Sequence, residues 1–164
     1  MAEVLPLSNA ELALLASLVK SRVRFMMVGL SAAALQGAPV VTQDVDLWFE
    51  DLSDPRLLTA LRAVRAAYVP PMGLNPPMLA GPGSQPFDIV LRMDGLGGFA
   101  DEYKRVKTIR LAGVKLKVLP LERILLSKVT AKRAKDLAVI PILRDVLLST
   151  DRGRRPRSKR DSKR

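Results

Sequence analysis

Three aspartates lie within otherwise apolar stretches of the sequence. A charged side chain in such a stretch calls for a specific role. Asp44 and Asp46 alternate with apolar residues in the segment 43–49, which has the two-residue period of a β-strand. Their carboxylates therefore share one face of that strand, within reach of one divalent cation or of two close ones. Asp88 lies in a second apolar run, 87–93, and is the only strand-embedded carboxylate downstream of the pair. Together the three would form an oxygen cage for Mg²⁺ or Mn²⁺, which can align a triphosphate and neutralise charge on a leaving pyrophosphate.

The composition restricts the chemistry to oxygen ligands. The sequence of 164 residues contains no cysteine and no histidine. Disulfides, Cys or His zinc sites, thiol nucleophiles and histidine-based triads are therefore excluded, and carboxylate sites favour Mg²⁺, Mn²⁺ or Ca²⁺. An alternative interpretation of Asp44 and Asp46 is that they are exposed and pair with surface lysines. Asp88 is harder to explain in that way, because its neighbours Phe87 and Ile89 are apolar.

A second candidate element precedes the first two aspartates. In the segment 28–31, Val-Gly-Leu-Ser, a glycine and a serine stand between an apolar strand and an expected helix. Gly29 would let the backbone approach phosphate oxygens, and Ser31 with the first helical amides could donate hydrogen bonds to them. An ordinary turn is the alternative interpretation of the same residues.

The order of these segments resembles a known superfamily. An apolar strand, Gly-x-Ser, a helix, Thr-x-Asp-x-Asp on a second strand and Asp88 on a third resemble the nucleotidyltransferases that share their core with DNA polymerase beta. More narrowly, the pattern resembles minimal nucleotidyltransferases related to the AbiEii toxins and similar uncharacterised bacterial proteins. The resemblance covers most of residues 22–145 and includes the closing segment 128–137, with its Arg-x-Lys-Asp signature.

The resemblance implies roles for individual residues. It implies metal binding and catalysis by Asp44, Asp46 and Asp88, and Mg²⁺ or Mn²⁺ as the cofactor. Phosphate or nucleotide contacts are implied for the residues that match the remaining motif positions: Gly29, Ser31, Thr42, Lys128, Arg133 and Lys135, with Asp136 as a possible helix anchor. Two departures, Leu30 after the glycine and Val40 where an arginine often stands, point to an altered substrate or an inactive site.

Structural alternatives exist for the last group and for the single tryptophan. Lys128, Lys132 and Lys135 recur at helical spacing and would form a solvated face of one helix. Arg133 and Asp136 are three apart and would pair with each other. Trp48 follows the aspartates on their face of the strand, and core packing is favoured over stacking on a base.

The elements that must position these side chains follow from periodicity and from Pro and Gly. The segment 70–86 contains six of the twelve prolines and is expected to be a long loop. The predicted fold class is α/β (α+β), with a small mixed sheet flanked by helices and a helical C-terminal portion. Helices are expected at 9–19, 31–36 and 55–67 and from 121 onward, kinked or divided at Pro141; strands are expected at 25–28, 43–49, 87–93, 104–111 and 114–118.

Charge and length suggest one domain with a tail. The net charge is +11, and residues 151–164 hold eight Lys or Arg against two Asp. We expect a nucleotidyltransferase-like domain at 1–150 and a disordered basic tail at 151–164, attracted to phosphate-rich partners such as tRNA or other RNA unless it only keeps the protein soluble. No apolar run approaches the roughly 18 residues of a membrane span, so no membrane partner and a cytoplasmic location are expected.

The predicted function is a metal-dependent transfer of a nucleoside monophosphate from a triphosphate to a hydroxyl. The acceptor remains open among RNA, protein and a small molecule, and the resemblance suggests a cognate antitoxin or toxin protein as a partner. The alternative is a catalytically inactive protein of the same fold that binds nucleic acid or a protein, and a weaker one is a basic assembly protein with incidental aspartates.

Overall fold

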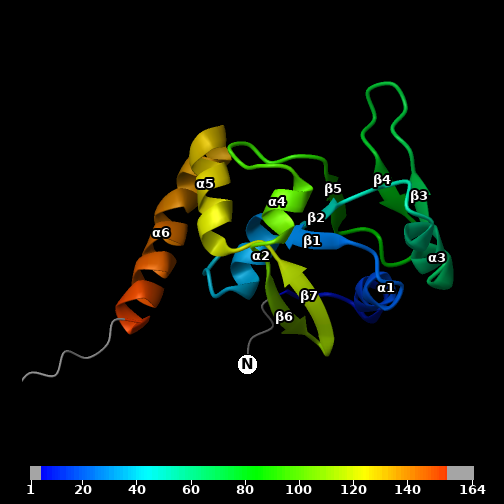
Figure 1. Cartoon of the computed structure of the whole chain (residues 1–164), viewed down its shortest axis with the longest axis horizontal. Helices are drawn as coiled ribbons and strands as arrows, with labels where there is room; N and C mark the ends of the chain where they lie inside the picture. Colours follow the sequence, from blue (N-terminus) through cyan, green and yellow to red (C-terminus); the bar gives the residue numbers. More distant parts are fainter. Residues whose placement is uncertain (1–4, 155–164) are drawn as a thin grey trace, which may run out of the picture.

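A five-stranded mixed sheet in the order β5-β2-β1-β7-β6 forms the centre of the protein. The structure is a computed structural model that describes residues 5–154 (Figure 1). A separate two-stranded sheet, β3-β4, projects at one side of Figure 1, and helices α5 and α6 lie side by side at the other. The elements are α1 (Asn9–Lys20), β1 (Phe25–Val28), α2 (Gly29–Leu35), β2 (Val45–Phe49), α3 (Pro55–Ala63), β3 (Ala67–Val69), β4 (Met78–Ala80), β5 (Phe87–Val90), α4 (Phe99–Tyr103), β6 (Lys107–Leu111), β7 (Val114–Val118), α5 (Leu121–Ala131) and α6 (Ala134–Arg154).

The two faces of the main sheet differ in character. One face carries Met27, Leu47 and Leu116, which are fully buried, and α1 packs against β7 on this side. The opposite face carries Asp46 and Trp48, because side chains alternate along a strand. Helix α4 covers the middle of this second face. Asp46 therefore lies on the same face of the sheet as α4, whose Phe99 packs against Trp48.

Local sequence explains where the helices begin. Ser8 and Glu11 form a reciprocal capping box at the start of α1, in which each side chain accepts a hydrogen bond from the other residue's backbone N–H. Asp54 caps α3, and Pro55 occupies the first helical position, where its missing N–H costs nothing. These signals are visible in the sequence, and α1 and β1 agree with their predicted bounds within one residue.

The predicted fold class is confirmed, while several boundaries move. Helix α3 ends at Ala63 rather than near residue 67, because Arg65 adopts a left-handed backbone conformation with φ of 59°. Helix α4, which the sequence analysis missed, delays the start of β6 from 104 to Lys107. The hairpin of β6 and β7 is confirmed, with Ala112 and Gly113 at its turn, both at positive φ.

The expected long loop at 70–86 is wrong in part. Residues Met78–Ala80 form β4, which pairs antiparallel with β3 at residues 67–69. The prolines remain compatible with this hairpin because they lie outside the paired segments, at 70, 71, 76, 77, 82 and 86. This proline-rich segment thus holds a short strand at residues 78–80, which are free of proline.

The C-terminal helical portion is divided at a place the sequence did not suggest. Lys132 takes a left-handed conformation at the end of α5, whereas Pro141 lies inside the continuous helix α6. Lys128, Lys132 and Lys135 therefore do not share one helical face, which corrects that interpretation. Helix α6 continues to Arg154, and the remainder of the expected tail, 155–164, lies outside the described residues.

Helix α6 is 21 residues long. Neither this helix nor any other within residues 5–154 has an apolar stretch long enough to cross a membrane.

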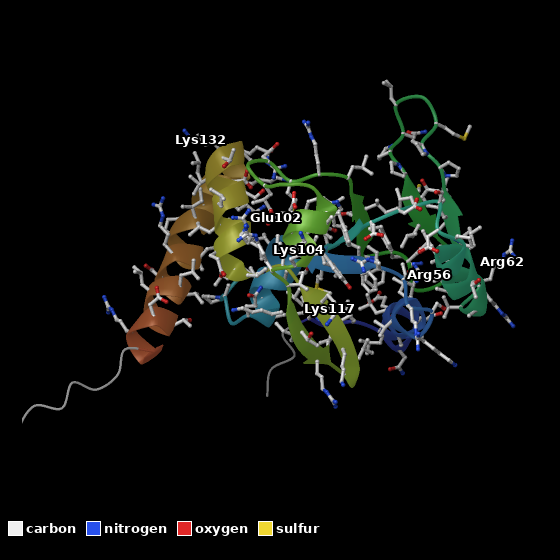
Figure 2. All side chains as sticks on the ribbon, in the orientation of Figure 1. Arg56, Arg62, Glu102, Lys104, Lys117 and Lys132 are labelled. Atoms are coloured by element: carbon white, nitrogen blue, oxygen red, sulfur yellow. The ribbon has the colours of Figure 1, made fainter. Side chains whose placement is uncertain are left out.

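A buried ion pair fixes α4 against α5. Glu102 is 1% exposed and accepts hydrogen bonds from Arg123 at 2.7 and 2.8 Å and from the backbone N–H of Gly97 at 3.1 Å. The hydrogen bond from Arg123 is the main cause of the lowered pKa of Glu102. Figure 2 shows Glu102 between the two helices, near the centre of the molecule. The position of α4 on the sheet depends on this contact.

Replacing Glu102 by glutamine should therefore destabilise the fold. Glu102→Gln leaves Arg123 without its charged partner, and the expected loss is about 3 kcal/mol in the free energy of unfolding. The matched control is Glu50→Gln, which removes the partner of Arg24 from an exposed pair and should cost less than about 1 kcal/mol. Urea denaturation of the three proteins measures both values. Equal losses would show that the buried pair contributes no more than the exposed one.

Candidate carboxylate site

The three predicted aspartates lie together at one edge of the sheet. Asp46 on β2 is the direct partner of Asp88 on the parallel strand β5. Neighbouring strands are about 4.8 Å apart, and partners in register project from the same face, so these two carboxylates are adjacent. Asp44, just before β2, joins them in lining a cavity of about 260 Å³. We call this cavity the carboxylate pocket; its other lining residues are Leu30, Thr42, Lys128, Lys135, Asp136 and Val139.

Strand direction explains the convergence. β2 runs antiparallel to β1 and parallel to β5, so the end of β1 lies beside the starts of β2 and β5. β7 is parallel to β1 and therefore ends at the same edge, from which the chain enters α5. The same ends of the strands thus bring together the Gly29 turn, the carboxylates and the helix that carries Lys128.

Gly29 makes room for Asp46. It follows β1 with φ of 70°, and a Cβ placed on it would overlap the Asp46 carboxylate. Only glycine satisfies both constraints, since it lacks a Cβ and adopts positive φ without strain. The predicted importance of Gly29 therefore has a direct structural cause, which is the close approach of a carboxylate.

Thr42 holds Asp44 in place. The Thr42 hydroxyl donates to the Asp44 carbonyl at 3.1 Å and accepts from the Asp44 N–H at 3.2 Å. Asp44 itself is exposed and faces the pocket from outside the strand. The predicted strand at 43–49 is accordingly shorter, because residues 43 and 44 form part of this turn.

Two lysines reach the pocket from the joint between α5 and α6. Lys128 makes an ion pair of 3.1 Å with Asp136, which is fully buried, and Arg133 donates to the same carboxylate at 2.8 Å. Asp136 also accepts from the Arg133 backbone N–H at 3.1 Å, so it anchors the first turn of α6. Lys135, exposed on that turn, lines the pocket as well. The anchoring role expected for Asp136 agrees with these contacts.

The electrostatics of the pocket oppose ionisation of two aspartates. Burial raises the pKa of Asp46, and the neighbouring charges of Asp88 and Asp44 raise it further against the opposing effect of Lys128 and Lys135. Burial and the charge of Asp44 also raise the pKa of Asp88. A divalent cation would relieve this repulsion, because it favours the charged form of each carboxylate.

The donor set suits Mg²⁺ or Mn²⁺ in a particular way. Within residues 5–154, no three acidic side chains converge tightly enough to form a complete metal cage. Mg²⁺ is commonly held by one or two carboxylates together with substrate phosphates, so a finished protein cage is not required. The adjacent pair Asp46 and Asp88 fits that mode, with Asp44 at the rim of the same cavity.

Some predicted residues lie elsewhere. Ser31 is buried, and its hydroxyl donates to the Val28 carbonyl at 3.2 Å, so it does not line the pocket. Arg133 pairs with Asp136 at the margin of the pocket. Trp48 packs edge-on against Phe99 of α4 with ring centroids 6.0 Å apart, which favours the core interpretation. Sequence reasoning missed Val139, because nothing in an apolar helical pattern distinguishes a pocket wall from a core residue.

Comparisons with known proteins add structural similarity but no sequence match. No protein family matches the sequence, and no curated protein matches it. A crystal structure described as an antigenic nucleotidyltransferase-like protein from Paracoccidioides brasiliensis is similar, with a TM-score of 0.49 and 18% identity, covering 91% of each chain. At this level the similarity carries no argument about function, which must come from the side chains of the pocket.

The raised pKa of Asp46 predicts a specific pH dependence of stability. The folded protein binds more protons than the unfolded one between the ordinary carboxyl pKa and the raised value, so stability falls as pH increases through that window. Asp46→Asn removes the charge and should make the protein more stable than wild type at pH 7 without metal. At pH 3 the difference should vanish, because both side chains are neutral.

Chemical denaturation at the two pH values checks this expectation. Asp51→Asn is the control with the opposite sign, because hydrogen bonds from the Ser53 hydroxyl and N–H lower the pKa of Asp51. A wild type that is more stable than Asp46→Asn at pH 7 would contradict the predicted repulsion.

The joint between α5 and α6 should depend strongly on Asp136. Asp136→Asn removes the buried charge that two cations share, and the expected loss is about 3 kcal/mol in the free energy of unfolding. Since hydrogen bonds from Arg133 and Lys128 outweigh burial and lower the pKa of Asp136, the wild-type advantage should disappear as acid protonates the folded carboxylate. Urea melts across the acidic range measure it, and an advantage that persists at the lowest pH would contradict this account.

Proposed function

We propose that this protein is a metal-dependent nucleotidyltransferase that moves a nucleoside monophosphate from a triphosphate to a hydroxyl. The observation that carries the proposal is the register of Asp46 and Asp88 across β2 and β5, in a pocket that Lys128 and Lys135 also line. Paired carboxylates beside lysines suit a triphosphate with its divalent cation, because the carboxylates can bind the cation and the lysines can bind the phosphates. The motif resemblance described above is consistent with this chemistry.

Each side chain has a distinct part in the proposed reaction. Asp46 and Asp88 would hold the cation from adjacent strands, and Asp44 would complete its oxygen ligands from the rim. Lys135 is exposed and makes no ion pair in the described part of the chain, so it is free to bind a phosphate. Lys128 is held by Asp136 and contributes a fixed positive charge. The cation would supply neutralisation of the phosphates and a lowered pKa for the attacking hydroxyl.

Space for a second reactant lies on the other side of Asp88. Asp88 also lines a cavity of about 610 Å³ between β5 and the β3-β4 hairpin, with mainly apolar walls that include Phe87, Ile89 and Met78. A carboxylate shared by two cavities is suitably placed between a nucleotide and an acceptor hydroxyl. We propose this second cavity as the acceptor side, for an acceptor that can be RNA, a protein or a small molecule.

A binding protein without turnover is the second candidate. Its support is the absence of a converged three-carboxylate cage within residues 5–154, together with Leu30 in the pocket wall. In that case the pocket would bind a nucleotide with its cation, and no pyrophosphate would be released.

The deciding experiment combines binding and turnover. Purified protein with Mg²⁺ and each labelled nucleoside triphosphate, in the presence of total RNA, should release pyrophosphate and label an acceptor. Asp46→Asn should lower this activity by at least about 1000-fold, because the metal-bound charge is lost. Asp51→Asn, an exposed aspartate outside the pocket, is the matched control and should keep full activity.

Thermal stability separates the two candidates. Mg²⁺ with a nucleotide should raise the melting temperature of wild type and fail to raise that of Asp46→Asn. Stabilisation without turnover would favour the binding protein. Neither stabilisation nor turnover would overturn both functions.

A further inference from the structure

Two segments far apart in the sequence form a strongly basic surface. Residues 20–24 contain three Lys or Arg and residues 104–118 contain six, and neither segment contains an Asp or Glu. All nine cationic side chains are exposed. We call the surface around Arg22, Arg24, Arg110, Lys115 and Lys117 the basic face, because four of these residues line one cavity and Arg110 is the cross-strand partner of Lys115. Lys107 pairs with Val118 and lies on the opposite face of the sheet. The basic face belongs to the folded body and is distinct from the basic residues of the predicted tail.

The basic face has a concave centre. Arg22, Arg24, Lys115 and Lys117 line a cavity of about 220 Å³ together with Tyr103, and no acidic residue contributes to its wall. The Arg24 guanidinium lies over the Tyr103 ring, 4.7 Å from its centroid. Figure 2 shows Lys117 on the β6–β7 hairpin and Lys104 near the end of α4.

Most of this charge is uncompensated within the molecule. Among the nine cations, only Arg24 takes part in an ion pair within residues 5–154, with the exposed Glu50. Like charges crowded on one surface raise the free energy of the unliganded protein and attract a polyanion. The surface therefore suits a partner that supplies several negative charges at close spacing.

The basic face and the carboxylate pocket occupy opposite ends of one sheet face. Asp46 and Trp48 lie on the α4 side of β2, and the alternation along β7 places Lys115 and Lys117 on that same side. Glu50, the partner of Arg24, is four residues beyond Asp46 along β2, a distance of about 13 Å. The two sites are therefore separate, with the aromatic side chains of α4 between them.

We propose that the basic face binds the backbone of a single-stranded polynucleotide. Closely spaced Lys and Arg suit successive phosphates, and the exposed Arg24 guanidinium over the Tyr103 ring, which Phe99 also stacks against at 5.0 Å, offers a planar group on which a base can stack. An anionic membrane fits less well, because none of the large exposed apolar residues in the described chain belongs to the two basic segments. The proposal does not depend on catalysis at the carboxylate pocket.

Arg22 offers a variant that removes charge without harming the fold. It adopts φ of 58°, a conformation that favours glycine, so Arg22→Gly relieves backbone strain while it deletes one cation from the cavity. Arg65 at the end of α3 adopts φ of 59° and is also exposed. Arg65→Gly is therefore a control with the same change in charge and in backbone preference, away from the basic face.

The test measures binding of the full chain to labelled oligouridylate and oligothymidylate of about 16 nucleotides over a range of salt concentrations. Lys115→Glu with Lys117→Glu should weaken binding by about tenfold or more and reduce the slope of log K against log salt by about 1.4. Arg62→Glu with Arg65→Glu makes the same change in net charge around the end of α3, and Figure 2 shows Arg62 at the right-hand end of the molecule, away from Lys117. This control should change the affinity by less than about threefold.

The remaining arms separate the possible outcomes. Arg22→Gly should weaken binding while Arg65→Gly does not, and both should remain folded by circular dichroism. Asp46→Asn should bind the oligonucleotides as wild type does, which keeps this result independent of the transferase proposal. Binding of either oligonucleotide that is lost in the basic-face variants supports the proposal. Equal weakening by the two charge-reversed pairs, or tighter binding to vesicles of phosphatidylserine and phosphatidylcholine than to both oligonucleotides, would overturn it.

Discussion

The central constraint in this structure is the repulsion between carboxylates that adjacent strands bring into register. Asp46 faces Asp88 across β2 and β5; burial is the largest cause of the raised pKa of both carboxyls, and the charges of neighbouring aspartates raise both further. The surrounding elements either leave room for these carboxylates or offset their negative charge. Gly29 leaves room for the Asp46 carboxylate, and the joint between α5 and α6 supplies Lys128 and Lys135. The site is therefore less stable than an apolar substitute would be, as is common where a fold retains charge for binding.

The distribution of charge along one sheet face extends this argument. At one end, the acidic side chains are partly offset by lysines; at the other, the basic face has almost no acidic counterpart in the described chain. Helix α4 lies between them, held down by the Glu102–Arg123 pair and by the contact of Phe99 with Trp48. The Glu102–Arg123 pair thus fixes the helix that lies between two surfaces of opposite sign.

Sequence reasoning succeeded where short-range signals decide the structure. The helical periodicity of 9–19, the apolar run of β1 and the two adjacent strands that form β6 and β7 are local signals, and the structure agrees with them. Strand alternation also fixes the common face of Asp46 and Asp88, and Asp44 lines the same pocket from the preceding turn; the predicted metal cage stays a prediction. The left-handed conformations of Arg65 and Lys132 were not predictable, since residues other than glycine rarely adopt positive φ. Ser31 was misplaced for a related reason: its hydroxyl bonds to its own turn.

The pairing of β1 with β7 has a consequence for how the chain reaches this structure. Met27 pairs with Val118, so the central strand of the sheet gains its second neighbour only when most of the chain is available. Contacts between such distant residues close slowly, because the intervening segment must lose its conformational freedom first. During synthesis, β1, β2 and β5 emerge with their carboxylates before the lysines of α5 and α6 exist. The nascent sheet thus carries an exposed edge and an uncompensated acidic end until the last helices leave the ribosome.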